Sequence, residues 1–233
     1  MNHEYIIKQL KKLSNPKNVE GMARFGIKSK HKLGIRKPAL RKLASQITKD
    51  PSLSNKTVRH RLAGQLWSSE ILEARILASM IDVPELVTEK QMDYWITGFD
   101  SWDLCDQVCM NLLDKTPLAY RKAVEWSKRE PEFEKRAGYA LMACLAWHDK
   151  EAPDSKFIKF FPHIKLGATD ERNFVKKAVN WALRQIGKRN KKLNGKAIKL
   201  AREIEKMDSK SARWIAKDAL RELSSEPVQS RFN

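Results

Sequence analysis

The chain has 233 residues, of which 42% are apolar and 32% charged, with 9 glycines and 9 prolines. It can therefore bury a large core without disulfides or metals, which excludes disordered chains and small disulfide scaffolds. Its formal net charge of +18 indicates an anionic partner, either a nucleic acid or an acidic surface.

Every element of the chain is predicted to be a helix, because apolar residues recur with a period near 3.6 and alternating β-branched runs are missing. In chain order, Asn15-Pro16 predicts an N-cap followed by the first residue of a helix, and Pro38 predicts another first residue. Further boundaries are predicted at Ser52, Pro84, Thr116-Pro117, Pro131, Pro153, Pro162, Gly167 and Gly195.

Residues 101–113 predict a helix at about the middle of the chain. Its apolar arc consists of Leu104, Cys105, Val108 and Leu112. Trp102 and Asp106 stand one turn apart at the edge of this arc, so they share a face. A carboxylate in such surroundings is a helix cap, a member of an ion pair or a functional group. The spacing leaves these alternatives open.

Two later helices carry further polar or aromatic residues of interest. Residues 138–147 are apolar nearly all round, so this helix is predicted to be buried, and Arg136 at its edge is interpreted as an ordinary rim residue. Residues 173–189 predict a helix whose buried stripe is made by Val175, Ala178, Val179, Ala182 and Ile186. Trp181 falls outside the stripe, beside Lys177, Arg184 and Lys188. It either packs on a neighbouring element with a cation–π contact or binds a ligand.

Comparable helix centres recur along the chain with separations of 29 to 42 residues, at Leu77, Leu112, Leu141, Leu183 and Leu220. This spacing is typical of one helix pair per repeat and favours a stacked all-α solenoid over a four-helix bundle. Such a solenoid has a concave face that suits a rod-shaped ligand. We expect a single helical-repeat domain over residues 1–225 and a C-terminal tail over residues 226–233.

The positive charge lies at the two ends of the chain. Residues 1–49 hold 13 Lys and Arg against 2 Asp and Glu, and residues 172–233 hold 17 against 6, so each end carries +11. The middle, residues 50–171, holds 16 against 20. Two basic ends around a mildly acidic middle indicate a clamp on nucleic-acid phosphates, with a solvated surface or acidic lipid as the alternatives.

The cysteines and the hydropathy profile indicate the compartment. Cys105 and Cys109 could share a metal, but no His or Cys motif completes a site, so we expect buried, reduced thiols together with Cys144 and no metal or cofactor. No run of 18 apolar residues occurs and the N-terminal segment is polar. We therefore expect a soluble cytoplasmic protein that makes no contact with a membrane.

An ordered set of segments resembles the AlkD-type DNA alkylation-repair glycosylases. The segments are Gly21-Met-Ala-Arg-Phe25, Leu33-Gly-Ile-Arg-Lys-Pro38, Trp102-Asp-Leu-Cys-Asp106, Lys135-Arg136-Ala137 and Phe174-Val-Lys-Lys-Ala-Val-Asn-Trp-Ala-Leu-Arg184. Each is weakly specific alone, but they keep their order and approximate spacing across residues 20–222. The resemblance implies a right-handed solenoid of HEAT-like repeats with a basic concave face.

The resemblance also implies a site and an activity. In that family an aspartate, two tryptophans and an arginine form the site, and they match Asp106, Trp102, Trp181 and Arg136 here. Phosphate contacts are expected from Arg36, Lys37, Lys177, Arg184 and Lys188. The implied activity is that of a monofunctional DNA N-glycosylase acting as a monomer on duplex DNA that contains N3- or N7-alkylated purines, associated with the nucleoid when bound.

Three positions depart from the family's pattern. Phe25 stands where some members carry tyrosine, which removes a hydroxyl contact. Ser101 replaces a second aromatic residue, and Lys37 replaces a small capping residue before Pro38 while adding a cation that attracts phosphate. Because Trp102 and Asp106 are both kept, catalysis is favoured over a non-catalytic protein that binds damaged or branched DNA. A protein–protein scaffold is the third alternative.

Overall fold

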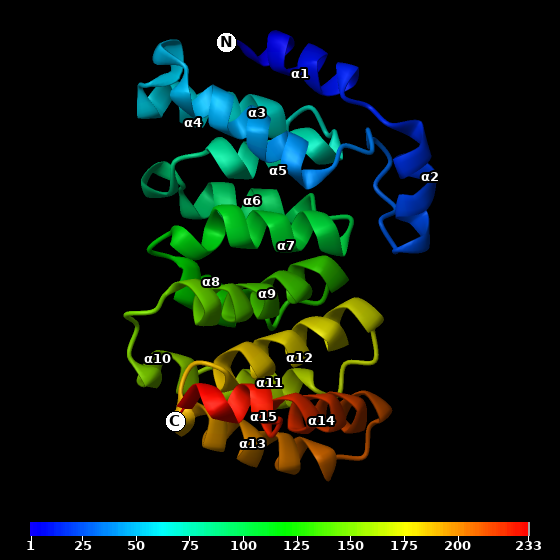
Figure 1. The fold of residues 1–233 in the computed structure, drawn as a ribbon, viewed down its shortest axis with the longest axis vertical. Helices are drawn as coiled ribbons and strands as arrows, with labels where there is room; N and C mark the ends of the chain where they lie inside the picture. The colour runs from blue at the N-terminus through cyan, green and yellow to red at the C-terminus, as the bar shows by residue number, and fades with distance from the viewer. Residues whose placement is uncertain (233) are drawn as a thin grey trace. The chain divides into compact units, whose positions relative to one another are not determined.

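The structure is a computed structural model that describes residues 1–232. All regular elements of this part of the chain are helices, as the apolar period predicts. The chain divides into two compact units, Met1–Thr116 (unit 1) and Pro117–Asn233 (unit 2), which are coloured blue to green and green to red in Figure 1. The single domain expected over residues 1–225 stays a prediction.

Unit 1 is built from helices that stack on α5. Its elements are α1 (His3–Lys12), α2 (Pro16–Arg24), α3 (Lys37–Lys49), η1 (Pro51–Leu53), α4 (Lys56–Trp67), α5 (Leu72–Ile81), η2 (Pro84–Leu86), α6 (Glu89–Thr97), α7 (Trp102–Asn111) and η3 (Leu113–Lys115). Helices α3, α4 and α7 all pack against α5, whose Leu77 is fully buried. Helix α2 has no buried residue and lies beside the stack (Figure 1).

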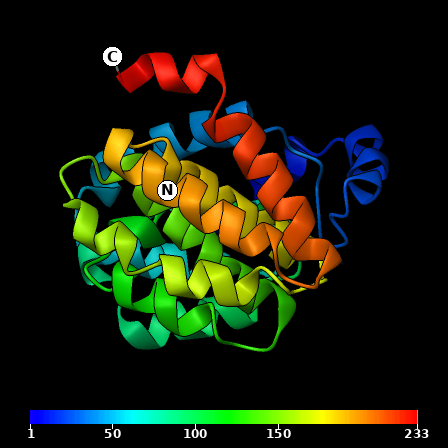
Figure 2. The ribbon, with the colours of Figure 1, turned by 90° about the horizontal axis from the view of Figure 1, so that it is seen from below.

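Unit 2 is also made of paired helices. Its elements are α8 (Ala119–Trp126), α9 (Glu132–His148), α10 (Asp154–Ile158), α11 (Phe161–Gly167), α12 (Asn173–Gly187), α13 (Lys191–Glu205), α14 (Lys210–Leu223), α15 (Glu226–Gln229) and η4 (Ser230–Phe232). Helix α12 packs between α9 and α14, and α13 lies beside α14 (Figures 1 and 2). Every residue of α9 from Arg136 to Ala146 is buried, as its composition predicts.

Polar bonds one repeat apart in sequence join neighbouring helix pairs. In unit 2, Asn180 donates to Asp218 at 2.6 Å and the Ser211 hydroxyl donates to the carbonyl oxygen of Asp170 at 2.8 Å, over separations of 38 and 41 residues. In unit 1 the carboxylate of Glu73 accepts from backbone N–H groups 38 to 40 residues away. These separations match the predicted repeat, and both units are made of helix pairs.

The predicted helix boundaries are largely confirmed. Asn15 caps α2 by accepting from the N–H of Asn18, and Pro16 is its first residue. Helix α3 begins one residue before Pro38, with Arg36 as an N-cap that makes no side-chain cap bond. The boundary predicted at Gly195 is wrong, because this residue lies inside α13. A glycine in a helix costs only about 1 kcal/mol relative to alanine, which the buried stripe of α13 offsets.

The expected C-terminal tail is helical over its described part. Residues 226–232 form α15 and η4, and Val228 is buried. Gln229 donates to Asn194 at 3.1 Å, so this segment is held against α13. No helix among residues 1–232 is long and apolar enough to cross a membrane.

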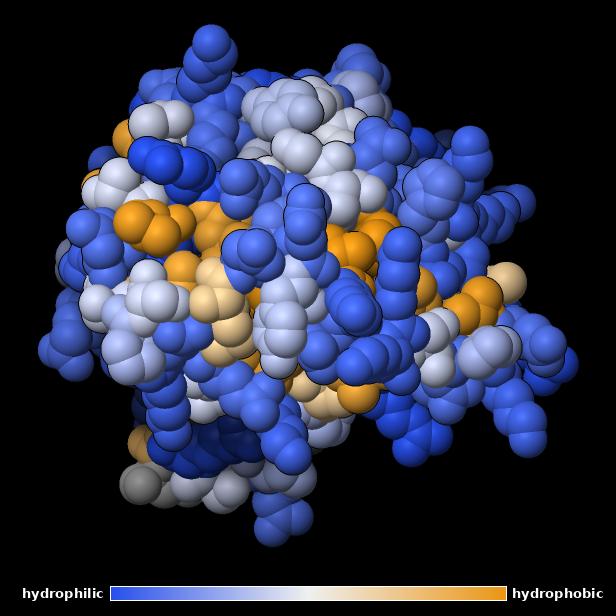
Figure 3. All heavy atoms as spheres, turned by 90° about the horizontal axis from the view of Figure 1, so that it is seen from above, coloured by the Kyte–Doolittle hydropathy of each residue, from blue (hydrophilic) through white to orange (hydrophobic). Residues whose placement is uncertain are grey.

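The end of unit 1 that carries α1 leaves apolar side chains uncovered. Tyr5, Leu13 and Val58 are each more than 40% exposed. Figure 3 looks onto the molecule from above and shows apolar atoms surrounded by hydrophilic side chains. In a stack of repeats each repeat contacts only its neighbours, and no described residue covers these side chains.

Candidate nucleic-acid interface

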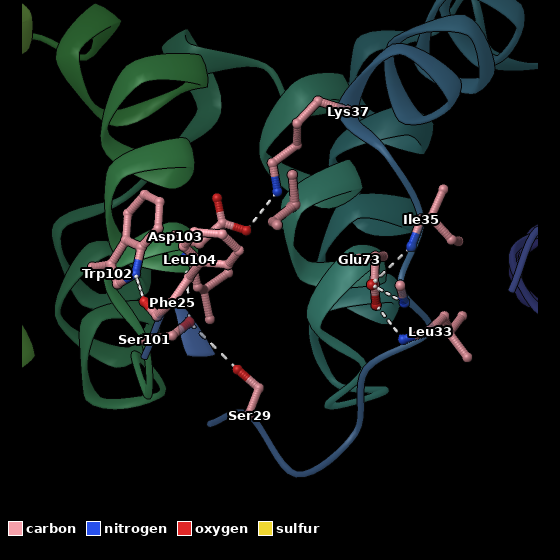
Figure 4. A network of polar contacts seen from close by, with 12 residues as sticks. Phe25, Ser29, Leu33, Ile35, Lys37, Glu73, Ser101, Trp102, Asp103 and Leu104 are labelled. Carbon is pink, nitrogen blue, oxygen red and sulfur yellow. Dashed lines mark hydrogen bonds and ion pairs between the residues drawn. The ribbon is translucent and has the colours of Figure 1, made fainter. Parts of the chain in front are cut away.

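Trp102 is fixed at the start of α7 by two local features. Ser101 is the N-cap and accepts from the N–H of Leu104 at 3.4 Å, which sets the first turn. The indole Nε1 of Trp102 donates to the carbonyl oxygen of Phe25 at 2.7 Å (Figure 4). The ring is half-buried, so part of its surface stays open to a ligand. A bond between segments 77 residues apart orients the aromatic plate.

The segment that contributes Phe25 is itself held by a buried carboxylate. Glu73 of α5 accepts from the N–H groups of Leu33, Gly34 and Ile35 at 2.8, 2.7 and 3.2 Å (Figure 4). Gly34 has a φ of +74°, and a Cβ there would collide with the carbonyl oxygen of Asn15. We call residues 14–36, which contain α2, the N-terminal arm. Its position relative to α7 follows from these bonds.

The two aspartates of α7 have different environments. Asp103 is buried, and its Oδ2 lies 2.5 Å from Nζ of Lys37 (Figure 4). Asp106 is half-buried, shares the face of Trp102 as predicted, and interacts with other groups of the protein. Sequence reasoning missed the role of Asp103. Lys37, expected to attract phosphate, has a carboxylate partner instead.

The basic face of α12 is also partly engaged within the protein. Lys177 is exposed and Trp181 half-buried, whereas Arg184 forms an ion pair with Glu222 of α14. Lys188 lies 2.7 Å from the same carboxylate. Burial raises the pKa of Glu222, but the hydrogen bond from Lys188 and the charge of Arg184 outweigh it, so the pKa is lowered. Two of the three predicted cations of α12 thus have an acid partner.

Trp181 lies outside the buried stripe of α12, as its position in the sequence predicts. The stripe residues Val175, Ala178, Val179, Ala182 and Ile186 are fully buried, and Trp181 is not among them. The cation–π contact considered for it occurs at another tryptophan, where Nζ of Lys176 lies 5.3 Å from the ring of Trp214.

Arg136 is not a rim residue. It is 5% exposed, and its Nη1 donates to the carbonyl oxygen of Phe174 at the start of α12. Arg136 makes further interactions within the protein besides this bond. The rim interpretation is therefore wrong, since the composition of α9 does not reveal which neighbour covers its first turn.

The structure distributes the predicted site residues over the two units. Unit 1 contains Trp102, Asp106, Arg36 and Lys37, of which Arg36 is exposed. Unit 2 contains Arg136, Trp181, Lys177, Arg184 and Lys188. A single site made of all four core residues stays a prediction. Among residues 1–232, no cluster of three or more His, Cys, Asp or Glu could hold a metal ion.

Comparison with known proteins gives the family. The model of the DNA alkylation repair enzyme family matches residues 6–223. This chain belongs to that family. The match confirms the resemblance drawn from the ordered segments, and its range covers both units.

A solved structure shares the fold of this DNA alkylation repair family member. It is a protein of a new family related to the HEAT-like repeat DNA glycosylases, with affinity for branched DNA structures. The likeness covers 95% of each chain with a TM-score of 0.73 at 21% sequence identity. The predicted HEAT-like repeat fold is thereby confirmed. No curated protein matches the chain.

Proposed function

We propose that this protein is a monofunctional DNA glycosylase that removes N3- or N7-alkylated purines from duplex DNA by hydrolysing the N-glycosidic bond. The observation that carries the proposal is the pair of Trp102 and Asp106. These half-buried residues share one face of α7, in a member of the DNA alkylation repair family. An aromatic plate beside a carboxylate suits a sugar that develops positive charge.

Hydrolysis of the glycosidic bond of an alkylated purine requires few catalytic groups from the protein. A purine alkylated at N3 or N7 is positively charged and leaves without a general acid. The enzyme then has to stabilise the oxocarbenium-like sugar and position a water molecule, and one carboxylate can do both. In this proposal Asp106 fills that role, Trp102 and Trp181 pack on the deoxyribose, and Arg136 holds a phosphate. No cofactor is needed.

Phosphates along the duplex would be bound by the remaining cations. Arg36 and Lys177 are exposed and therefore available. Lys37, Arg184 and Lys188 have carboxylate partners, so they contribute by exchanging a carboxylate for a phosphate. Such an exchange gains less free energy than binding by an unpaired cation.

The decisive experiment measures release of 7-methylguanine from an alkylated duplex under single-turnover conditions. Asp106→Asn is nearly isosteric and removes the charge, so excision should fall by about two orders of magnitude or more while duplex binding is kept. Asp103→Asn is the matched control on the same helix. Parental excision by Asp106→Asn would show that Asp106 is a structural carboxylate.

Trp181→Ala tests the second tryptophan in the same assay. If the ring packs on the sugar, excision should fall while the melting temperature stays nearly constant. If it is a core residue, the free energy of unfolding should fall by about 3–5 kcal/mol with unchanged activity per folded molecule. Thermal melts and rates from one preparation separate these outcomes.

A second candidate function is binding of branched DNA without excision. The observation in its favour is the fold shared with a protein described as having affinity for branched DNA. A four-way junction and a linear duplex of equal length distinguish the two functions. Tight junction binding with no base release from any alkylated duplex would support the non-catalytic function.

A further inference from the structure

A cavity in unit 2 has one of the residues assigned above, Lys188, in its lining. It has a volume of about 520 Å³ and is lined by residues at the C-terminal ends of α9 and α12, among them Trp147, Gln185 and Arg189. Arg136 stands near the beginning of α9, eleven residues before Trp147. At 1.5 Å per residue this is about 16 Å along the helix axis. One nucleotide cannot contact both residues.

Trp147 is the least typical residue of this cavity. It is 47% exposed, although the eleven residues before it on α9 are buried. The ring stacks on His148 with centroids 4.9 Å apart and planes 26° apart. An indole supported by a neighbouring ring and open to solvent provides a preorganised stacking surface.

The cations around Trp147 differ in their surroundings: Arg189 is bonded within the protein, whereas Lys150 and Arg231 are exposed. Arg189 donates to the carbonyl oxygens of Ala146, Lys150 and Ala152 and lies 4.0 Å from the ring centroid of Phe157, so it closes the C-terminal end of α9. The side chains of Lys150 and Arg231 are exposed at the cavity.

The acidic residue in the lining does not cancel this charge. Asp154 accepts from the amide of Asn190 at 2.8 Å and has Lys192 at 3.9 Å. Lys188 is paired with Glu222. Lys150, Arg189 and Arg231 therefore leave the cavity positively charged beside an open aromatic face.

The geometry points to a binding site for an unpaired nucleotide of single-stranded DNA, with its base stacked on Trp147 and its phosphates beside Lys150 and Arg231. A volume of about 520 Å³ is within the usual range of ligand sites. Base–aromatic stacking beside a basic groove is how proteins bind single strands without sequence preference. The amide of Gln185 can donate or accept at a base edge. The inference rests on the proposed function only in taking DNA as the ligand.

The test measures binding of a fluorescent, unmodified eight-nucleotide oligo-dT to the full chain. Trp147→Ala should weaken binding by about tenfold or more, the effect of removing the stacking surface of one base. Trp147→Phe keeps a stacking surface and should recover most of the affinity. Replacing Lys150 and Arg231 by Gln together should reduce the slope of log affinity against log salt by roughly 0.7 for each phosphate that is no longer neutralised.

Trp214→Ala is the matched control, because Trp214 is also in unit 2 and is 41% exposed. Parental oligo-dT affinity in Trp147→Ala, or an equal decrease in both alanine variants, overturns the inference. If Trp147→Ala lowers the melting temperature, the phenylalanine variant decides instead. A stably folded Trp147→Phe that does not recover the affinity for oligo-dT then overturns the inference. The oligonucleotide carries no lesion, so this result is independent of 7-methylguanine release, and either proposal can fail without the other.

Discussion

The two ends of the chain carry the same net charge, but their cations have different surroundings. Within residues 1–49, all of which are described, the ion pairs are those of the N-terminal amine with Asp50 and of Lys37 with Asp103. Cations of the C-terminal end pair with carboxylates far more often, as seen for Arg172, Arg184, Lys188, Lys192, Arg213 and Arg221.

Equal net charge at the two ends therefore does not mean that the same number of cations is available to bind phosphate. At the C-terminal end, part of the positive charge joins neighbouring helix pairs, as in the bonds from Arg184 and Lys188 to Glu222. At the N-terminal end, Lys28, Lys30 and Arg36 are exposed along the N-terminal arm. We therefore expect the arm to dominate contact with phosphates.

The largest expected effect is on duplex binding as a function of salt. Raising the salt concentration from 50 to 200 mM should weaken binding by roughly 10³-fold, because several phosphate contacts release counterions. Fluorescence anisotropy with a labelled duplex measures this. An affinity that hardly changes over the range would contradict binding through phosphates altogether.

Replacing cations by glutamine at each end in turn tests which end contacts the phosphates. Replacing Lys28, Lys30 and Arg36 by Gln should lower the slope of log affinity against log salt by about three. Replacing Lys192, Arg213 and Arg221 by Gln is the matched control and should lower it by less, because each has a carboxylate partner. Equal changes in the two triple variants would remove the distinction between the ends.

Asp103→Asn tests the ion pair that holds the N-terminal end to α7. The side chains of Asp103 and Lys37 are 10% and 27% exposed, so the amide leaves a largely desolvated ammonium without its counter-charge. The free energy of unfolding should fall by about 1–3 kcal/mol, with excision per folded molecule unchanged. Chemical denaturation measures the first quantity and single-turnover kinetics the second. A large decrease in excision at full stability would assign Asp103 to the chemistry.

Glu222→Gln makes the C-terminal end resemble the N-terminal one. It removes the carboxylate shared by Arg184 and Lys188, but Arg184 keeps Asp218 at 3.5 Å as a partner. Duplex affinity should therefore rise about threefold, since Lys188 becomes available to phosphate. A modest decrease in melting temperature should accompany it. Unchanged affinity in this variant would mean that Lys188 does not approach the DNA.

The smallest expected effect is a decrease in stability in acid. The pKa values of Glu222 and Asp170 are lowered, in each case because bonds to cations outweigh burial, which alone raises them. A lowered carboxyl pKa stabilises the fold above the ordinary value, which is 4.5 for Glu222 and 3.8 for Asp170, and this stabilisation disappears as the pH falls through the lowered pKa. Melting temperatures measured from about pH 5.5 to 3 should therefore fall in the acid range, and less steeply in Glu222→Gln.

The helices were predictable from the sequence because burial follows a period that the sequence displays. The stripe of α12 and the arc of α7 lie where the apolar residues place them, and Trp181 and Asp106 lie outside them. Contacts between distant segments were not predictable. Nothing in the sequence assigns Lys37 to Asp103, 66 residues away, or Glu73 to the backbone of Leu33. Those partners depend on how the helices pack in three dimensions. The period of apolar residues along the sequence carries no information about this packing.

The bonds that span one repeat have a consequence for how such a chain can change in length. Asn180 reaches Asp218 and Ser211 reaches Asp170, each across one helix pair and its neighbour. Because the two residues of the first bond lie one repeat apart, duplicating that repeat places a second asparagine beside Asn180 at one junction, and an amide can both donate and accept there. Inserting half a repeat moves the donor and the acceptor apart and leaves a buried polar group without a hydrogen-bond partner. Gene rearrangements that keep the period are thus tolerated best, and the array can evolve in units of about 40 residues.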